Sequence, residues 1–109
     1  MPREFVIAIY RPKQGMDSNL HRIIEDHVPK LRRLGLATDY PATVLKSRID
    51  GALVEFFEWK SVEAVKAAHE HSEVLKMWDE FAEVCDYGSL ASLKEAGKLF
   101  AHFDFVGQF

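Results

Sequence analysis

Residues 43–59, with the sequence TVLKSRIDGALVEFFEW, decide the fold of this chain. At their centre, Asp50 and Gly51 form a dipeptide that is typical of a tight β-hairpin. The run before them, residues 43–49, alternates basic and less polar side chains, which predicts an edge strand. The run after them, residues 52–59, is apolar on both faces apart from two glutamates. We therefore expect it inside a sheet that is covered above and below.

A strand and a helix are expected before this hairpin. Residues 5–11 are again apolar on both faces, which predicts a second strand inside the sheet. Asp17 and Ser18 indicate the start of a helix, whose apolar residues recur at helical spacing until Gly35 ends it. Pro29 lies inside this helix, so we expect a kink there.

The chain after the hairpin predicts two more helices and a last strand. Ser61 caps a short helix that runs to His69, and Ser72 caps a longer, amphipathic one. Residues 89–96 indicate one more short helical piece, and residues 100–106 form the last strand. No linker or repeat interrupts the series, so residues 1–109 are expected to form a single domain.

Strand, helix, hairpin, helix and strand make a βαββαβ order. This order predicts an α+β fold of ferredoxin-like type: a four-stranded antiparallel sheet, its first and third strands central, with helices on one face. The central strands are apolar on both faces, so the other face also needs a cover. A second copy of the chain related by a two-fold axis is the simplest cover, which predicts a homodimer.

Composition narrows the possible partners and the compartment. Fourteen Lys and Arg stand against seventeen Asp and Glu, and the basic residues are scattered, which argues against nucleic-acid binding. No segment is long and apolar enough to predict a membrane span. The single cysteine, Cys85, cannot form an internal disulfide, so we expect a cytoplasmic protein. Cys85 continues the apolar stripe of the longer helix, which favours a buried thiol over a catalytic one.

The order of elements carries a family resemblance, together with three short segments. Residues 58–61 (EWKS) close the third strand, Ala68 and His69 follow, and residues 74–78 lie in the next helix. This pattern resembles the antibiotic biosynthesis monooxygenase-like (ABM) family over nearly the whole chain. The resemblance implies a dimeric α+β barrel. Its members include cofactor-independent oxygenases of polycyclic phenols, haem-degrading enzymes and proteins without a known reaction.

Haem degradation is not expected here. The haem-degrading members carry an Asn on the first strand, and a Trp and a His on the second helical segment. Counted from Trp59, the two helical positions fall on Ala68 and Trp78, and the first strand has no Asn. Phosphate, flavin and nicotinamide fingerprints are also missing, so no cofactor is expected.

By the same resemblance, a ligand pocket lies between the helices and the sheet. If Trp59 faces this pocket, strand alternation puts Phe57 and Glu55 on the same side. A carboxylate among apolar side chains is costly unless it is paired, and such a group is suited to taking or giving a proton. The alternative is that Glu55 leans to the rim of the sheet or pairs with an arginine.

His27 is the second candidate catalytic residue, because it interrupts the apolar stripe of the first helix. Held by Glu55, it would be a workable general base; alternatively it is a hydrogen-bonded core residue. His69 and His102 are further residues that could line the cavity. His69 and His71 form an HxH pair, but they straddle a helix end, so we expect a solvated junction and no metal site.

Three aromatic residues, Tyr10, Trp78 and Phe81, would wall the pocket and suit a flat hydrophobic ligand, or simply fill the core. The leading hypothesis is a small cofactor-independent monooxygenase-like enzyme that acts on a hydrophobic, aromatic small molecule. Two alternatives stay open: a non-catalytic ligand-binding or sensing dimer, and a proton-transfer isomerase.

Overall fold

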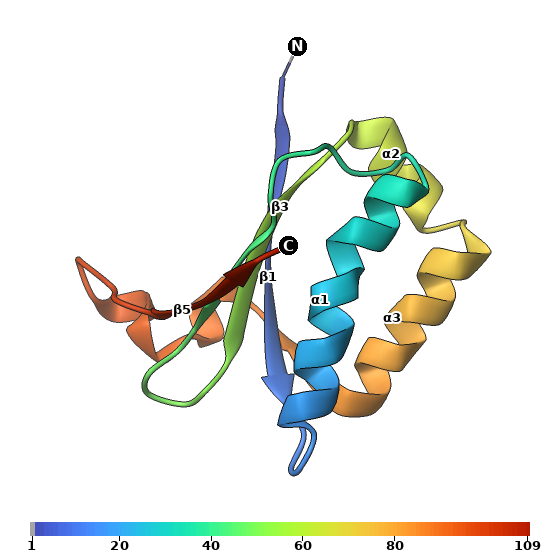
Figure 1. Ribbon diagram of the computed structural model, residues 1–109. Coiled ribbons are helices and arrows are strands. Elements are labelled where there is room, and N and C mark those ends of the chain that lie inside the picture. Colours follow the sequence, from blue (N-terminus) through green and yellow to red (C-terminus); the bar gives the residue numbers. More distant parts are fainter. Residues whose placement is uncertain (1) are drawn as a thin grey trace.

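The computed structural model describes residues 2–109 and has an α+β fold (Figure 1). Its antiparallel sheet has the strand order β4-β1-β3-β2-β5. The strands are β1 (Glu4–Pro12), β2 (Thr43–Lys46), β3 (Leu53–Trp59), β4 (Cys85–Gly88) and β5 (Asp104–Gln108). The helices are α1 (Asp17–Arg33), α2 (Val62–Ala68) and α3 (Ser72–Val84), and two 3-10 turns follow, η1 (Leu90–Ser92) and η2 (Lys94–Gly97). None of the helices in residues 2–109 has the length and apolarity that crossing a membrane requires.

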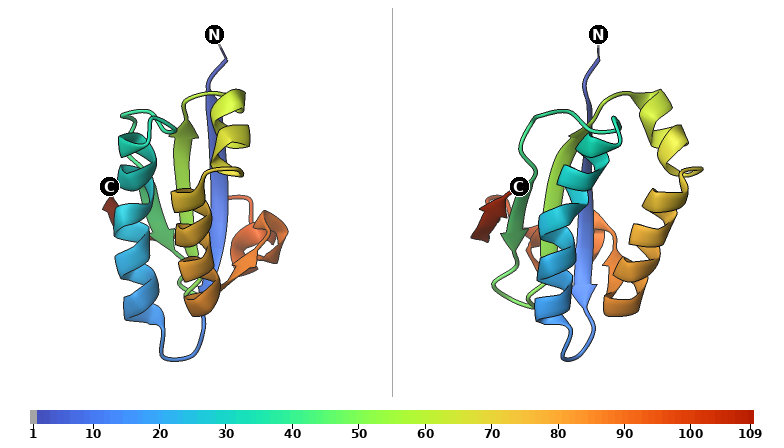
Figure 2. Two further views of the ribbon diagram at one scale, coloured as in Figure 1. Left: turned by 90° about the vertical axis from the view of Figure 1, so that its right-hand side faces the viewer. Right: turned by 45° about the vertical axis from the view of Figure 1, so that its right-hand side comes forward.

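The helices and the 3-10 turns lie on opposite sides of the sheet. Figures 1 and 2 show α1 and α3 side by side on one face, with η1 and η2 beyond the other. The main core fills the space between helices and sheet. Its fully buried members include Leu20, Ile24 and Leu31 of α1, Val44 of β2 and Phe81 of α3.

The two strands expected inside the sheet are inside it. β1 lies between β4 and β3, and β3 lies at the centre. Their register pairs Ile7 with Phe56 and Ala8 with Glu55. Because paired residues point to the same face, Glu55 faces the helices and Phe56 faces away from them.

The expected hairpin is confirmed, but its loop is longer than two residues. Lys46 pairs with Leu53, which leaves residues 47–52 as the connection. Gly51 has φ +77°, a backbone conformation that favours glycine, and the Asp50 carboxylate accepts a hydrogen bond from the Ala52 amide at 3.0 Å.

The prediction of four strands is wrong, since the sheet has five. α3 ends at Val84, and Cys85 opens β4 instead of continuing the helical stripe. The chain leaves the helix there because Cys85 pairs with Pro12 and Asp86 with Arg11, which completes the hydrogen bonding of β1.

The last strand also differs from the expectation. It covers Asp104–Gln108 instead of residues 100–106, and it adds to β2 through the pair Lys46 and Asp104. β2 is therefore an internal strand and not the expected edge.

The predicted start of α1 at Asp17 is confirmed, and of the predicted side-chain caps one, Ser61, is confirmed. The Ser61 hydroxyl accepts a hydrogen bond from the Ala64 amide at 3.0 Å, as an N-cap should. α3 is instead capped by His71, whose Nδ1 accepts from the Glu73 amide at 3.2 Å. α1 begins at Asp17 without a side-chain cap, and Pro29 stays within it.

Candidate functional site

Three buried polar side chains meet between the helices and the sheet. The Tyr10 hydroxyl donates a hydrogen bond to Glu55 Oε1 at 2.7 Å. His27 Nδ1 lies 2.9 Å from Glu55 Oε1 and 3.1 Å from Oε2. Glu55 is 0% exposed, and Tyr10 and His27 are each 3% exposed. Below, Tyr10, Glu55 and His27 are called the triad.

The fold positions each member of the triad from a different element. Glu55 lies opposite Ala8 in the β1–β3 register, so Tyr10, two residues further along β1, points to the same face. His27 lies in the buried stripe of α1, with Ile24 and Leu31 one turn away on either side.

Aromatic rings enclose the triad. The Phe81 ring stacks on Tyr10 with centroids 4.9 Å apart and planes 14° apart. The His27 ring meets Phe81 edge-on at 5.0 Å and Phe57 edge-on at 5.4 Å. Because the three side chains are almost fully buried, the hydrogen bonds within the triad are electrostatically strong.

The geometry defines the proton positions that the triad can hold. Burial and the nearby Glu55 carboxylate raise the pKa of Tyr10 well above its usual value, so Tyr10 is a neutral hydrogen-bond donor. A carboxylate can only accept, so in a pair with ionised Glu55 the hydrogen that joins the two side chains is on His27 Nδ1. The lone pair of a neutral His27 ring is then on Nε2. This arrangement is suited to general-base chemistry.

A surface pocket between α3 and β4 leads toward the triad. It has a volume of about 410 Å³, and its lining includes Tyr10, Trp78, Phe81 and Tyr87. Tyr10 and Phe81 thus belong both to the pocket wall and to the surroundings of Glu55. Glu55 and His27 themselves lie behind these two rings.

The other predicted pocket residues occupy different places. Phe57 and Trp59 are 2% and 7% exposed, and their rings pack against each other in the core with centroids 5.2 Å apart. His69 is exposed, but its ring contacts Trp78 edge-on at 5.0 Å. Its Nδ1 lies 2.8 Å from the Val65 carbonyl oxygen.

The remaining histidines and the carboxylates do not gather into a metal site. Within residues 2–109, no three side chains of the His, Cys, Asp and Glu types come close enough to hold an ion. Asp104, which follows His102 on the last segment, pairs with Arg48 at 2.8 Å. His71 caps α3.

The sequence did not predict that Glu58, which is 5% exposed, accepts from Arg3 and the Thr38 hydroxyl, nor did it predict two further polar contacts at buried positions. The first is Tyr10 with Glu55, since Tyr10 was expected only as an apolar wall. The second is Ser47 with Glu95, whose hydroxyl and carboxylate lie 2.8 Å apart on the other face of the sheet. Glu95 lies in the 3-10 turn η2 and Ser47 in the β2–β3 loop, so no periodic pattern of the sequence relates these two residues.

Alkaline pH should destabilise the fold through the groups around β4. Burial raises the pKa of Cys85 to about 11 and that of Tyr87 to about 12, and it also raises that of Tyr10. The unfolded chain then loses these protons first, so stability is retained below pH 9 and falls as the pH rises through 11. Urea unfolding between pH 7 and 11 should show this fall.

The variant Cys85→Ala provides the control for this pH dependence. It removes one of the titrating groups, so stability should fall less steeply with pH between 9 and 11. A stability that is constant up to pH 11 in the wild-type protein would contradict the expectation.

Comparisons of this chain with protein-family models, with curated proteins and with solved structures found no match. The chemistry of the triad is therefore inferred from its own geometry.

Proposed function

We propose that this protein is a small, cofactor-independent monooxygenase-like enzyme that acts on a hydrophobic, aromatic small molecule. The triad carries this proposal, because it joins an imidazole and a carboxylate at 2.9 Å inside an aromatic enclosure. Such a pair is a suitable general base for a phenol, and the aromatic walls of the pocket suit a flat ring.

In the proposed mechanism the phenol enters from the pocket beside Trp78, and the Tyr10 and Phe81 rings move aside to admit it. His27 Nε2 takes the phenolic proton, while Glu55 stabilises the imidazolium through Nδ1. The electron-rich phenolate then reacts with dioxygen at a ring carbon that carries hydrogen. Overall, one phenol and one O₂ give one quinone and one water, so O₂ receives all four electrons that the substrate loses.

Oxygen uptake tests this function. With 1-naphthol as the probe, the protein should consume one O₂ for each quinone formed. The rate should be proportional to protein concentration and unchanged by a chelator, because His27 and Glu55 supply the base. An oxygen electrode and the quinone absorbance give the two readings. Absence of protein-dependent uptake with naphthols and hydroxyanthracenes would contradict the proposal.

A second function is favoured by the burial of the triad. Glu55 is 0% exposed and His27 is 3% exposed, which is typical of a structural polar cluster beneath a ligand pocket. A non-catalytic binding or sensing protein would bind the same aromatic ligand without turnover. A proton-transfer isomerase would turn over without consuming oxygen, so the oxygen electrode separates it from the oxygenase.

We further propose that the fold is a ferredoxin-like unit with an added strand. The order β4-β1-β3-β2 together with α1 and α3 supports this, and β5 extends the sheet beyond β2. The resemblance to the ABM family and its dimeric α+β barrel is part of the same proposal. So is a cytoplasmic location, since the single cysteine is a free, buried thiol.

The proposed homodimer rests on the sheet face that points away from the helices. Ile7 and Phe105 on this face are 48% and 65% exposed, and Phe5 beside them is 44% exposed. Light scattering at micromolar concentration should give twice the chain mass of 12.5 kDa. A mass of one chain would contradict the dimer.

A matched pair of variants locates the proposed interface. Ile7→Asp places a charge on the sheet face and should give monomers, because a desolvated charge without a partner disfavours association. Leu75→Asp is the control, since Leu75 is similarly exposed, at 42%, but lies on α3. It should leave the mass unchanged.

A further inference from the structure

A segment near the C-terminus covers part of the sheet face that the helices leave open. Residues 89–103, called the strap here, contain η1 and η2 and lie across this face (Figures 1 and 2). Leu93 of the strap is buried against Ile9, Ala52 and Val54. These residues form a small second core.

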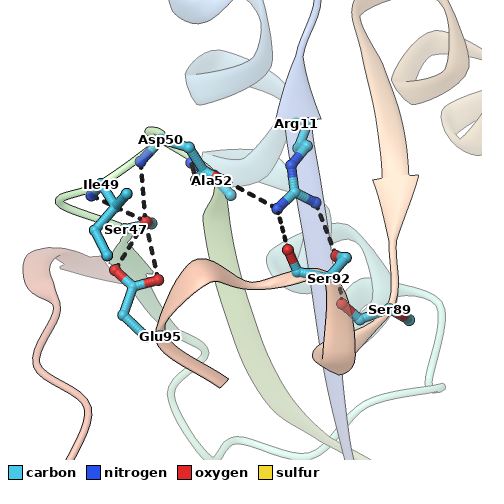
Figure 3. Close-up of polar contacts among 8 residues, drawn as sticks. All are labelled: Arg11, Ser47, Ile49, Asp50, Ala52, Ser89, Ser92 and Glu95. Carbon is cyan, nitrogen blue, oxygen red and sulfur yellow. Dashed lines mark hydrogen bonds and ion pairs between the residues drawn. The ribbon is translucent and has the colours of Figure 1, made fainter. Parts of the chain in front are cut away.

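Polar contacts fix the strap in place at two points (Figure 3). The Arg11 guanidinium donates to the Ser92 hydroxyl and carbonyl oxygens, both at 2.8 Å, and to the Asp50 carboxylate at 3.0 Å. The Ser47 hydroxyl donates to the Glu95 carboxylate, with oxygen distances of 2.8 and 3.1 Å. The strap is thus bonded both to β1 and to the β2–β3 loop.

Between the strap and the sheet lies a groove of about 620 Å³. Its walls are mainly apolar and include Val54 and Phe56 of β3, and Leu93, Ala96 and Phe103 of the strap. This volume falls within the range of roughly 300–1,000 Å³ that is typical of small-molecule sites. The groove is on the opposite face of the sheet from the triad.

Glu95 contributes a buried carboxyl group to this groove, at 2% exposure. An ionised carboxylate can accept about four hydrogen bonds, yet in residues 2–109 its side chain receives the single proton of the Ser47 hydroxyl. No Lys, Arg or His of these residues lies within ion-pair distance of it. Glu95 therefore has acceptor capacity for a donor that a ligand would bring.

The charged side chains around Glu95 determine which kind of hydrogen-bond donor a ligand can bring to it. Glu95 also lines a smaller adjoining pocket of about 220 Å³, together with Arg48, Lys98 and His102. An anionic ligand would be repelled by the Glu95 carboxylate, and a cationic one by Lys98, which lines both the groove and the adjoining pocket; the charge of Arg48 is balanced by Asp104. A neutral hydroxyl group avoids both penalties and satisfies the carboxylate.

We propose that this groove binds a small, uncharged apolar molecule whose hydroxyl group donates a hydrogen bond to Glu95. The apolar body lies between Phe56 and the strap, and Ser47 holds the carboxylate in position. In the homodimer proposed above, the second copy would roof this groove. The two proposals are nevertheless tested by different measurements.

An NMR titration with three probes of one shape tests the site. The probes are 2-naphthol, which is neutral at pH 7, 2-naphthoate, which is anionic, and 2-naphthylmethylamine, which is cationic. We expect 2-naphthol to shift the backbone amides of Leu93, Glu95 and Ala96 in a saturable way. The two charged probes should bind there at least tenfold more weakly, because each meets a like charge.

Substitutions then assign the hydroxyl contact. Glu95→Gln keeps the shape and an oxygen for Ser47, but loses the charge, so 2-naphthol should bind the strap about tenfold more weakly. Glu73→Gln on α3 is the matched control and should leave this affinity unchanged. If Glu95→Gln does not fold, Ala96→Phe, which fills the groove, should abolish the shifts in its place.

Several results would overturn the proposal. One is a set of shifts confined to Tyr10 and Trp78, which would place the probe in the other pocket. A second is equal affinity of the three probes. The third is a protein that is dimeric by light scattering and whose strap amides do not shift with 2-naphthol. That result would mean that a second copy of the chain, and not a small molecule, occupies the groove. None of these results bears on oxygen uptake.

Discussion

Replacing Glu55 by Ala is expected to lower the free energy of unfolding by about 3–5 kcal/mol, measured by urea denaturation. The substitution removes the shared acceptor of Tyr10 and His27, both of which are 3% exposed. Two buried donors then lack a partner, and each costs about 1–3 kcal/mol. The lost side-chain volume adds a cavity, since the surrounding rings relax only in part.

Glu58→Ala is the matched control for this prediction. Glu58 is on the same strand but pairs with Arg3, whose side chain is 61% exposed. Glu58 also accepts a hydrogen bond from the Thr38 hydroxyl at 2.8 Å. Arg3 is solvent-exposed and Thr38 is partly so, and water can satisfy both donors when Glu58 is removed, so the expected loss is clearly smaller than for Glu55→Ala. If the free energy of unfolding falls by the same small amount in both variants, the triad does not stabilise the fold as its burial implies.

The sequence predicted the pairing of His27 with Glu55 for a physical reason that can be stated. Each is a single polar residue in an otherwise apolar stripe, one on a helix and one on a strand. Two such groups must be satisfied inside the core, and the simplest way is to satisfy each other. Apolarity on both faces likewise placed β1 and β3 inside the sheet.

Other features depend on long-range contacts that the hydrophobic periodicity of the sequence does not predict. β4 is only four residues long and follows a stripe at Met77 and Phe81 that Cys85 continues at helical spacing. Only its pairing with β1 makes it a strand. The Tyr10 hydroxyl reaches Glu55 because of the β1–β3 register, which a single sequence does not specify.

The position of the strap is the feature that the sequence pattern predicts least. Glu95 and Ser47 are separated by 48 residues, and they lie in the short 3-10 turn η2 and in the β2–β3 loop. Their contact follows from where the strap crosses the sheet. The apolar residues of β1 and β3 predict that the second sheet face is covered. They do not predict that the strap, a segment of the same chain, supplies part of this cover.

Glu55→Gln separates a catalytic triad from a structural one. The amide keeps the size of the carboxylate and an oxygen that can accept from Tyr10, so stability should fall much less than in Glu55→Ala. The negative charge that stabilises a protonated His27 is lost, however. We therefore expect turnover of 1-naphthol to fall on the order of a hundredfold or more, with little change in the affinity for the probe.

The measurement is steady-state oxygen uptake across pH, together with urea unfolding of the same samples. Glu58→Gln is the matched control: it makes the same chemical change on β3, but on the face away from the triad, and should keep the wild-type rate. A structural triad gives the opposite result. In that case Glu55→Gln lowers stability, because His27 loses its charged partner, while ligand binding and any turnover stay at the wild-type level. That outcome would exclude His27 and Glu55 as the base and favour the non-catalytic binding protein.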